Sequence, residues 1–126
     1  MQKSGGAVTH MKNADIEWII GSENIKAFPF KPYSDTVIDF LDEVSSILRK
    51  KAVRGKYNDI STLAFWCRRG NLLKLKENAG NLSNRLGRGL VFHITPSNVP
   101  VNFAFSYFFG LLSGNGNIVR VPSKKY

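Results

Sequence analysis

The pattern of apolar and polar runs near the end of the chain predicts a strand, a helix and a second strand. Residues 90–94 form an apolar run of strand length, followed by the turn formers Thr-Pro-Ser-Asn. A second apolar run covers residues 101–112 after Pro100, a residue well suited to a first helical turn. Residues 113–116 supply glycine for a left-handed helix cap, and residues 117–121 form another apolar strand. The pattern indicates a parallel βαβ unit.

This unit places two turns at one edge of the predicted sheet. Ligands of open parallel sheets bind beyond the carboxyl ends of the strands. The turns at residues 95–98 and 122–124 both lie at those ends. We therefore expect a binding site there.

The preceding part of the chain is predicted to be helical. Apolar positions recur at helical spacing in residues 34–51, with Ser34 or Asp35 as the N-terminal cap. A second helical stretch begins near residue 59, and the Gly-Asn pair at residues 70–71 divides it in two.

Three segments follow from these patterns. Residues 1–33 form an irregular segment with a short β-like run at residues 16–20, and residues 34–86 form a helical lead-in that ends in a polar loop. Residues 87–126 form the βαβ unit. The predicted fold class is α/β, a helical lead-in followed by the first βαβ unit of a parallel sheet.

Composition places the chain among globular proteins. Its 126 residues are 43% apolar and 12% aromatic, and one cysteine excludes an internal disulfide. No signal-peptide core is present at the N-terminus, and the longest apolar stretch is shorter than the roughly 20 residues that span a bilayer. We expect a cytoplasmic protein without a membrane span, and no residue cluster has the spacing of a metal site.

The net charge of +9 leaves two interpretations open. One is a basic module that binds a polyanion, and the other is a solvated basic surface. The basic end of residues 34–51 fits an anion contact or simple complementation of the helix dipole. Nucleic acid is disfavoured because the cations are scattered without interleaved aromatic residues; they include Lys26, Lys31, Lys50, Arg54, Arg69, Lys76, Arg88 and Lys124.

Three side chains are candidates for chemistry. Asn98 lies in a turn bracketed by prolines, where its amide fits either an oxyanion donor or a helix cap. His93 lies inside an apolar strand and is interpreted as a satisfied buried histidine. Cys67 is interpreted as a small buried hydrophobe, because no positioned base lies near it in sequence.

The sequences GLVFHITPSNVP at residues 89–100, FGLLSGN at residues 109–115 and IVRVPSK at residues 118–124 resemble the aldehyde dehydrogenase superfamily. The likeness is greatest to its acyl-CoA reductase branch, the LuxC-like enzymes that make fatty aldehydes for bacterial luminescence and related pathways. The resemblance is strong over residues 87–124 and weaker over residues 34–86. It implies a Rossmann-like, aldehyde dehydrogenase-like sheet, present here only in part, and a dinucleotide-binding role for residues 87–126.

The resemblance also implies roles for individual residues. Asn98 matches the asparagine that stabilises the thiohemiacetal oxyanion. Family residues that match Ile94, Thr95, Pro96 and Ser97 line the nicotinamide side of the cofactor. A family motif after the second strand binds the adenine ribose, and the cofactor-binding residues implied there are Arg120, Ser123 and Lys124. The implied substrate is a fatty acyl-CoA or another acyl thioester, and the full-length enzyme is expected to be a homo-oligomer.

Two departures from the family's ribose motif bear on the cofactor. The family motif is Lys-Pro-Ser-Glu, and residues 121–124 of this chain read Val-Pro-Ser-Lys. Val121 therefore stands in place of the lysine, with a cation one residue earlier at Arg120, and Lys124 stands in place of the glutamate. A one-residue shift on a strand turns a side chain to the opposite face, which leaves open whether Arg120 replaces that lysine. Lysine in place of glutamate attracts a 2′-phosphate, so the expected cofactor is NADP, as NADPH.

The family's cysteine nucleophile and general-base glutamate match no residue of this chain. Their positions would fall after residue 126, so we expect an N-terminal part of a reductase that is inactive alone. Two alternatives remain. One is a non-catalytic remnant that acts as a basic anion-binding module, and the other is a subunit completed by a separate chain that carries the cysteine.

Overall fold

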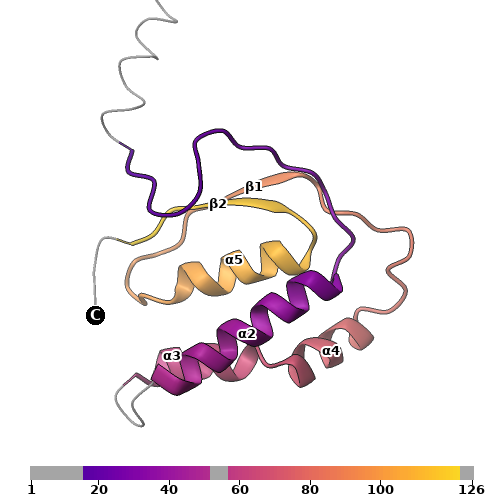
Figure 1. The fold of residues 1–126 in the computed structure, drawn as a ribbon, viewed down its shortest axis with the longest axis horizontal. Helices are drawn as coiled ribbons and strands as arrows, with labels where there is room; N and C mark the ends of the chain where they lie inside the picture. The colour runs from indigo at the N-terminus through magenta and orange to yellow at the C-terminus, as the bar shows by residue number, and fades with distance from the viewer. Residues whose placement is uncertain (1–15, 52–56, 123–126) are drawn as a thin grey trace, which may run out of the picture.

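The described part of the protein is arranged in layers, with helix α5 between a small sheet and the helices α2, α3 and α4. The computed structural model describes residues 16–51 and 57–122. Helix α5 covers one face of the sheet, and the other helices pack below it (Figure 1). The elements are α2 (Asp35–Lys51), α3 (Asn58–Trp66), α4 (Arg69–Asn78), β1 (Leu90–His93), α5 (Asn102–Leu112) and β2 (Gly116–Val119).

The predicted βαβ unit is confirmed. Strands β1 and β2 are parallel neighbours, with Leu90 opposite Gly116 and His93 opposite Val119. Helix α5 connects them and contacts both. The α/β class is therefore correct at the level of helices on a parallel sheet. The strands are shorter than predicted, because β1 ends one residue earlier and β2 begins at Gly116 and ends at Val119.

Local signals set the ends of two helices as the sequence predicts. The backbone N–H of Val37 donates to Ser34 Oγ at 3.4 Å, so Ser34 caps α2. Gly114 follows α5 with a positive φ of 86°, the left-handed conformation that glycine adopts readily. The N–H groups of Gly114 and Asn115 donate to the carbonyls of Leu111 and Gly110. This pair of bonds is the Schellman motif that closes a helix.

The core joins the helical lead-in to α5. Trp66 at the end of α3 packs against two rings of α5, with centroids 5.8 Å from Phe105 and 4.8 Å from Phe109. The hydroxyl of Ser45 on α2, fully buried, donates to the Ala64 carbonyl on α3 at 2.5 Å. The buried core residues are Ile38, Leu41, Leu63, Cys67, Leu72, Val101, Ala104, Phe108 and Leu112. The three-segment division at residues 33/34 and 86/87 stays a prediction.

Two details differ from the sequence-based expectations. The β-like run at residues 16–20 is not a strand, and these residues are exposed. An apolar run needs a partner ladder to become a strand, and none is present for it among the described residues. The second helical stretch divides at Cys67-Arg68, before Gly70. The backbone N–H of Arg69 donates to Asp42 Oδ1 of α2 at 2.9 Å, which starts α4 at this point.

The segment before α2 crosses the sheet on the side away from α5 (Figure 1). The N–H of Phe30 donates to the Gly114 carbonyl at 2.8 Å, and the Phe30 carbonyl accepts from the Gly87 N–H at 2.9 Å. The Tyr33 N–H donates to the Leu112 carbonyl at 2.7 Å. This irregular connection therefore fixes the loop before β1 against the end of α5. In the described ranges, no helix is both long and apolar enough to cross a membrane.

Candidate active site

The carboxyl ends of the two parallel strands lie together, and the turn after β1 leaves the sheet there. Of the second predicted turn, at residues 122–124, only Pro122 lies within the described residues. The N–H of Arg120 donates to the His93 carbonyl at 3.0 Å, which extends the ladder one residue beyond β2. The segment after β1 leaves this edge of the sheet toward α5, and the chain leaves β2 at the same edge (Figure 1). The structure thus brings the turn after β1 next to Arg120.

Asn98 is exposed in the turn before α5 and does not cap that helix. The N-cap of α5 is Val101, and no side chain caps it. The Asn102 N–H donates to the Val99 carbonyl at 3.1 Å, so the turn is closed by backbone groups. No hydrogen bond joins the Asn98 amide to another described residue. The helix-cap alternative does not hold, and the amide is available to a ligand.

The residues predicted to line the nicotinamide side occupy the same turn. Ile94 is 65% exposed, and Pro96 and Ser97 are also exposed, whereas Thr95 is half-buried. Alternation along β1 places Ile94 on the same face as Leu90 and Phe92, the face that α5 does not cover. Their cofactor role stays a prediction, and the geometry leaves them accessible to a bound molecule.

Arg120 is the predicted cofactor cation that the structure describes. Asn117 points toward α5, so alternation from Ile118 to Arg120 puts Arg120 on the open face and Val121 on the α5 side. Arg120 and Val121 thus lie on opposite faces by the same alternation, and the cofactor role of Arg120 stays a prediction. Arg120 is exposed. Ser123 and Lys124 lie outside the described residues.

His93 is buried and fully hydrogen-bonded, as the sequence predicts. It is 8% exposed. Its Nδ1 lies 2.7 Å from Ser106 Oγ on α5, and its Nε2 lies 2.7 Å from Asn117 Oδ1 on β2. A single imidazole therefore joins the three elements of the βαβ unit.

Sequence reasoning missed the two partners of His93. One signal was present: Asn102, Ser106 and Gly110 recur every fourth residue in an otherwise apolar helix. Such spacing lines one face of a helix with small or polar side chains. A polar Asn117 inside an apolar strand was the complementary signal.

Cys67 cannot serve as a nucleophile in this fold. Its side chain is fully buried, and desolvation by burial raises the pKa of the thiol to about 12. The neighbouring Arg68 does not offset this, because its guanidinium lies over the Phe65 ring, 3.7 Å from the centroid. The thiolate needed for acyl transfer is thus scarce at neutral pH.

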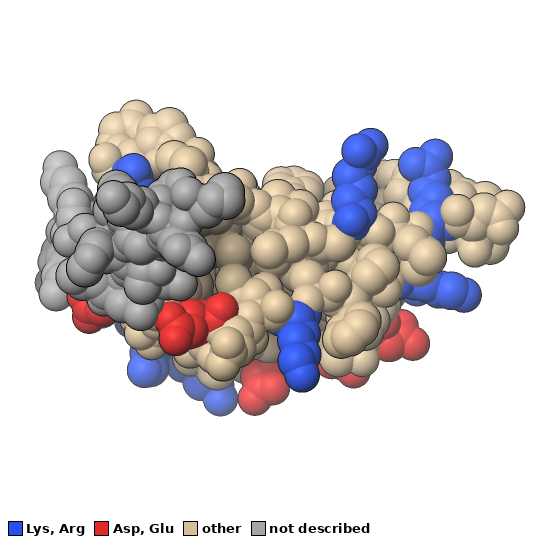
Figure 2. All heavy atoms as spheres, turned by 90° about the horizontal axis from the view of Figure 1, so that it is seen from above, with Lys and Arg blue, Asp and Glu red and all other residues tan. Residues whose placement is uncertain are grey.

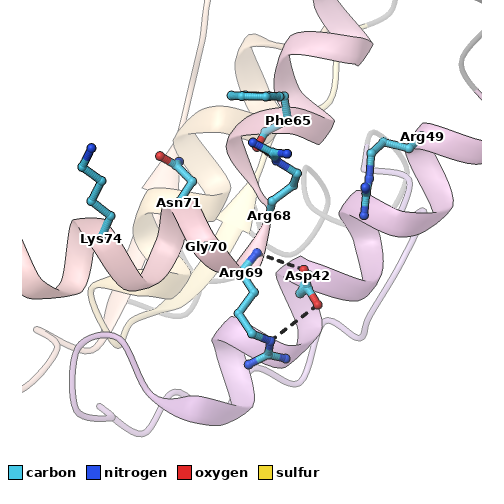
Figure 3. A pocket seen from close by; sticks show the side chains of 8 residues that line it. All are labelled: Asp42, Arg49, Phe65, Arg68, Arg69, Gly70, Asn71 and Lys74. Carbon is cyan, nitrogen blue, oxygen red and sulfur yellow. Dashed lines mark hydrogen bonds and ion pairs between the residues drawn. The ribbon is translucent and has the colours of Figure 1, made fainter.

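A hollow of about 510 Å³ between α2, α3 and α4 gathers several cations. Arg69 is engaged by Asp39 at 2.6 Å and Asp42 at 3.6 Å. Arg49 donates from Nε to the Ser45 carbonyl of its own helix. Figure 3 shows Arg49, Arg68 and Lys74 on different parts of the helical layer, with their charged ends apart from one another. These cations do not converge on one point, so the hollow does not support the interpretation of the basic helix end as an anion-binding site.

The remaining charge is dispersed. On the face seen in Figure 2, Lys and Arg side chains stand apart around a broad uncharged centre. Within the part of the chain that the structure describes, no group of three His, Cys, Asp or Glu side chains is placed to hold a metal ion.

Comparison with known proteins gives one family. The family model described as acyl-CoA reductase (LuxC) matches residues 27–125. Neither the curated proteins nor the solved structures give a match. The matched residues include α2 to α5, both strands and the turn that carries Asn98. Because the match covers most of the chain, this protein belongs to the LuxC family of acyl-CoA reductases.

Proposed function

We propose that this chain forms the cofactor and oxyanion side of an NADPH-dependent reductase that converts a fatty acyl thioester to an aldehyde. The observation that carries the proposal is the exposed Asn98 amide, which caps no helix and sits beyond the carboxyl end of β1. Membership of the acyl-CoA reductase family supports the reaction class.

The residues at this sheet edge fit a dinucleotide. The Arg120 N–H donates to the His93 carbonyl, so Arg120 lies next to the turn after β1, and that turn exposes an apolar residue, Ile94, next to polar ones. A flat apolar surface beside hydrogen-bonding groups suits a nicotinamide ring, and Arg120 adds a cation. Lysine at position 124 in place of an acidic residue favours a 2′-phosphate. NADPH, when bound, supplies the hydride.

The chain's contribution to the reaction is to hold charge on oxygen. A cysteine thiolate from polypeptide outside these 126 residues attacks the thioester carbonyl, and the carbonyl oxygen becomes an oxyanion. The Asn98 amide N–H groups donate to that oxygen as the tetrahedral adduct expels the CoA thiolate. The same donors hold the oxygen again when hydride adds, before the aldehyde leaves and the cysteine thiolate is regenerated.

The direct test is cofactor binding to the 126-residue chain. Titration followed by NADPH fluorescence is expected to show about tenfold tighter binding of NADPH than of NADH, a difference of about 1.4 kcal/mol. Lys124→Glu should abolish that preference, because a carboxylate repels the 2′-phosphate. Lys125→Glu is the matched control for net charge, and it should leave the preference unchanged. Absence of binding to the wild-type chain would refute the proposed cofactor role.

The second test concerns turnover. The chain alone should not oxidise NADPH in the presence of a long-chain acyl-CoA, because its single thiol is buried. When the cysteine-bearing polypeptide is supplied, Asn98→Ala should lower kcat by about 10²–10³-fold, the usual effect of removing an oxyanion donor. Asn84→Ala, in an exposed loop, is the control. Turnover by the chain alone, or an Asn98→Ala enzyme with normal kcat, would contradict the mechanism.

A further inference from the structure

The buried imidazole of His93 is held from two sides by groups of different elements. Ser106 Oγ of α5 lies 2.7 Å from Nδ1, and Asn117 Oδ1 of β2 lies 2.7 Å from Nε2. His93 is also the last residue of β1. The network therefore spans the whole βαβ unit.

The partners determine which ring nitrogen carries the hydrogen. Asn117 Nδ2 donates to the Asn115 carbonyl at 2.8 Å, which turns its Oδ1 toward the imidazole. An amide oxygen only accepts, so His93 Nε2 must be the donor. In the neutral ring, Nδ1 is then an acceptor, and the Ser106 hydroxyl donates to it. Every polar atom of the ring is satisfied by this single arrangement.

Gly110 makes the close approach of these groups possible. A Cβ at this position would collide with the Asn117 side-chain oxygen and would lie 2.9 Å from His93 Nε2. A methyl group there would have to displace the asparagine or the imidazole. Because Gly110 has no side chain, α5 can lie close to both strands at the position of His93 and Asn117.

The network lies directly behind the candidate active site. The His93 carbonyl accepts from the Arg120 N–H, and the next residue, Ile94, begins the turn that leads to Asn98. We propose that His93, locked as the Nε2–H tautomer by Ser106 and Asn117, is a positioning residue that fixes the turn after β1 relative to Arg120 and to α5. Its consequence for cofactor binding rests on the proposed function.

The tautomer is tested by ring ¹⁵N NMR of the 126-residue chain at alkaline pH, where histidine side chains are neutral. The protein has two histidines, so the His93→Gln variant identifies the signals. The expected spectrum has the proton on Nε2 and a bare Nδ1. A proton on Nδ1, or a fast mixture of both tautomers, would overturn the assignment.

The positioning role is tested by NADPH affinity at a temperature where circular dichroism shows each variant to be folded. Ser106→Ala and Gly110→Ala should each weaken NADPH binding about tenfold, the loss expected for one disrupted buried hydrogen bond. The controls are Ser113→Ala, at the exposed end of the same helix, and Gly70→Ala, whose added Cβ meets nothing within 4 Å. Both should bind within about twofold of wild type. Folded Ser106→Ala and Gly110→Ala proteins with wild-type affinity would refute the role.

Rescue separates positioning from general stability. His93→Gln can donate and accept like the imidazole, so it should retain more affinity than the apolar His93→Leu. If the wild-type chain binds no NADPH, the proposed function fails, and the backbone amide shifts of Ser106→Ala decide the inference instead. Shifts at both Ile94 and Arg120 would uphold the link between the turn after β1 and Arg120, and an unchanged signal at either residue would overturn it.

Discussion

Burial decides what the single cysteine can do. In sequence, Cys67 stands beside Arg68, and a neighbouring cation lowers the pKa of a thiol when it can reach the sulfur. In the fold, Arg68 turns away to stack on Phe65, and the thiol lies inside the core of the helical layer. Desolvation then raises its pKa to about 12.

The burial of Cys67 predicts slow reaction with thiol reagents. At pH 8, a disulfide reagent such as DTNB should label the native chain at least about a hundredfold more slowly than the unfolded chain, because each pKa unit removes tenfold of the thiolate. The measurement compares labelling rates in buffer and in guanidinium chloride. Native labelling as fast as unfolded labelling would show that Cys67 is accessible.

At the scale of elements, the end of α5 organises its surroundings. Gly114 closes the helix in a left-handed conformation, and its carbonyl accepts from the Phe30 N–H. A Cβ on Gly114 would collide with the Phe30 carbonyl oxygen. Gly114 thus ends α5, leaves room for the backbone of Phe30 and precedes β2.

Gly114→Ala is therefore expected to destabilise the protein strongly. The left-handed backbone alone costs about 1–2 kcal/mol for a residue with a Cβ, and the collision with Phe30 adds to this. Chemical unfolding of wild type and variant measures the difference. Gly70→Ala is the control, since it places a methyl group in open space on a helix and should be neutral or slightly stabilising. An equal effect of the two substitutions would contradict this account.

At the scale of the whole molecule, one face of the sheet is covered only in part, by the segment before α2. Leu90, Phe92 and Ile94 are 47%, 58% and 65% exposed on the side away from α5. The N-terminal segment that crosses this side adds exposed Phe28 and Phe30. Among the described residues the sheet has two strands, so both are edge strands, which offer backbone groups for pairing. A large exposed apolar surface of this kind promotes association.

The chain is therefore expected to self-associate over the micromolar to millimolar range, where exposed apolar surface and strand edges drive aggregation. Phe92→Lys should shift the average mass in sedimentation experiments toward that of a monomer, because it places a charge among the exposed apolar side chains of that face. Leu73→Lys, on an exposed apolar position of α4, is the matched control and should change little. A wild-type chain that is monodisperse and monomeric at every concentration would refute the prediction.

The sequence by itself determined the βαβ unit, and it placed the ends of the two strands and of the helix to within about two residues. Apolar runs of strand and helix length, separated by proline and glycine turns, specify that unit through local geometry. The cap at Ser34 and the left-handed cap at Gly114 follow from the same short-range rules. The position of Asn98 in a turn between β1 and α5 could also be predicted from the sequence, because the end of a strand and the start of a helix are local features.

Only the tertiary structure decided where side chains meet. The break between α3 and α4 falls at Cys67-Arg68 because Asp42, from a helix distant in sequence, accepts the Arg69 N–H. The run at residues 16–20 has strand-like composition but no partner among the described residues. His93 was recognisable as buried, whereas its partners Ser106 and Asn117 depend on how α5 is seated on the sheet. These hydrogen bonds join residues that are distant in sequence, so they depend on how the helices and strands pack, and local sequence patterns do not specify that packing.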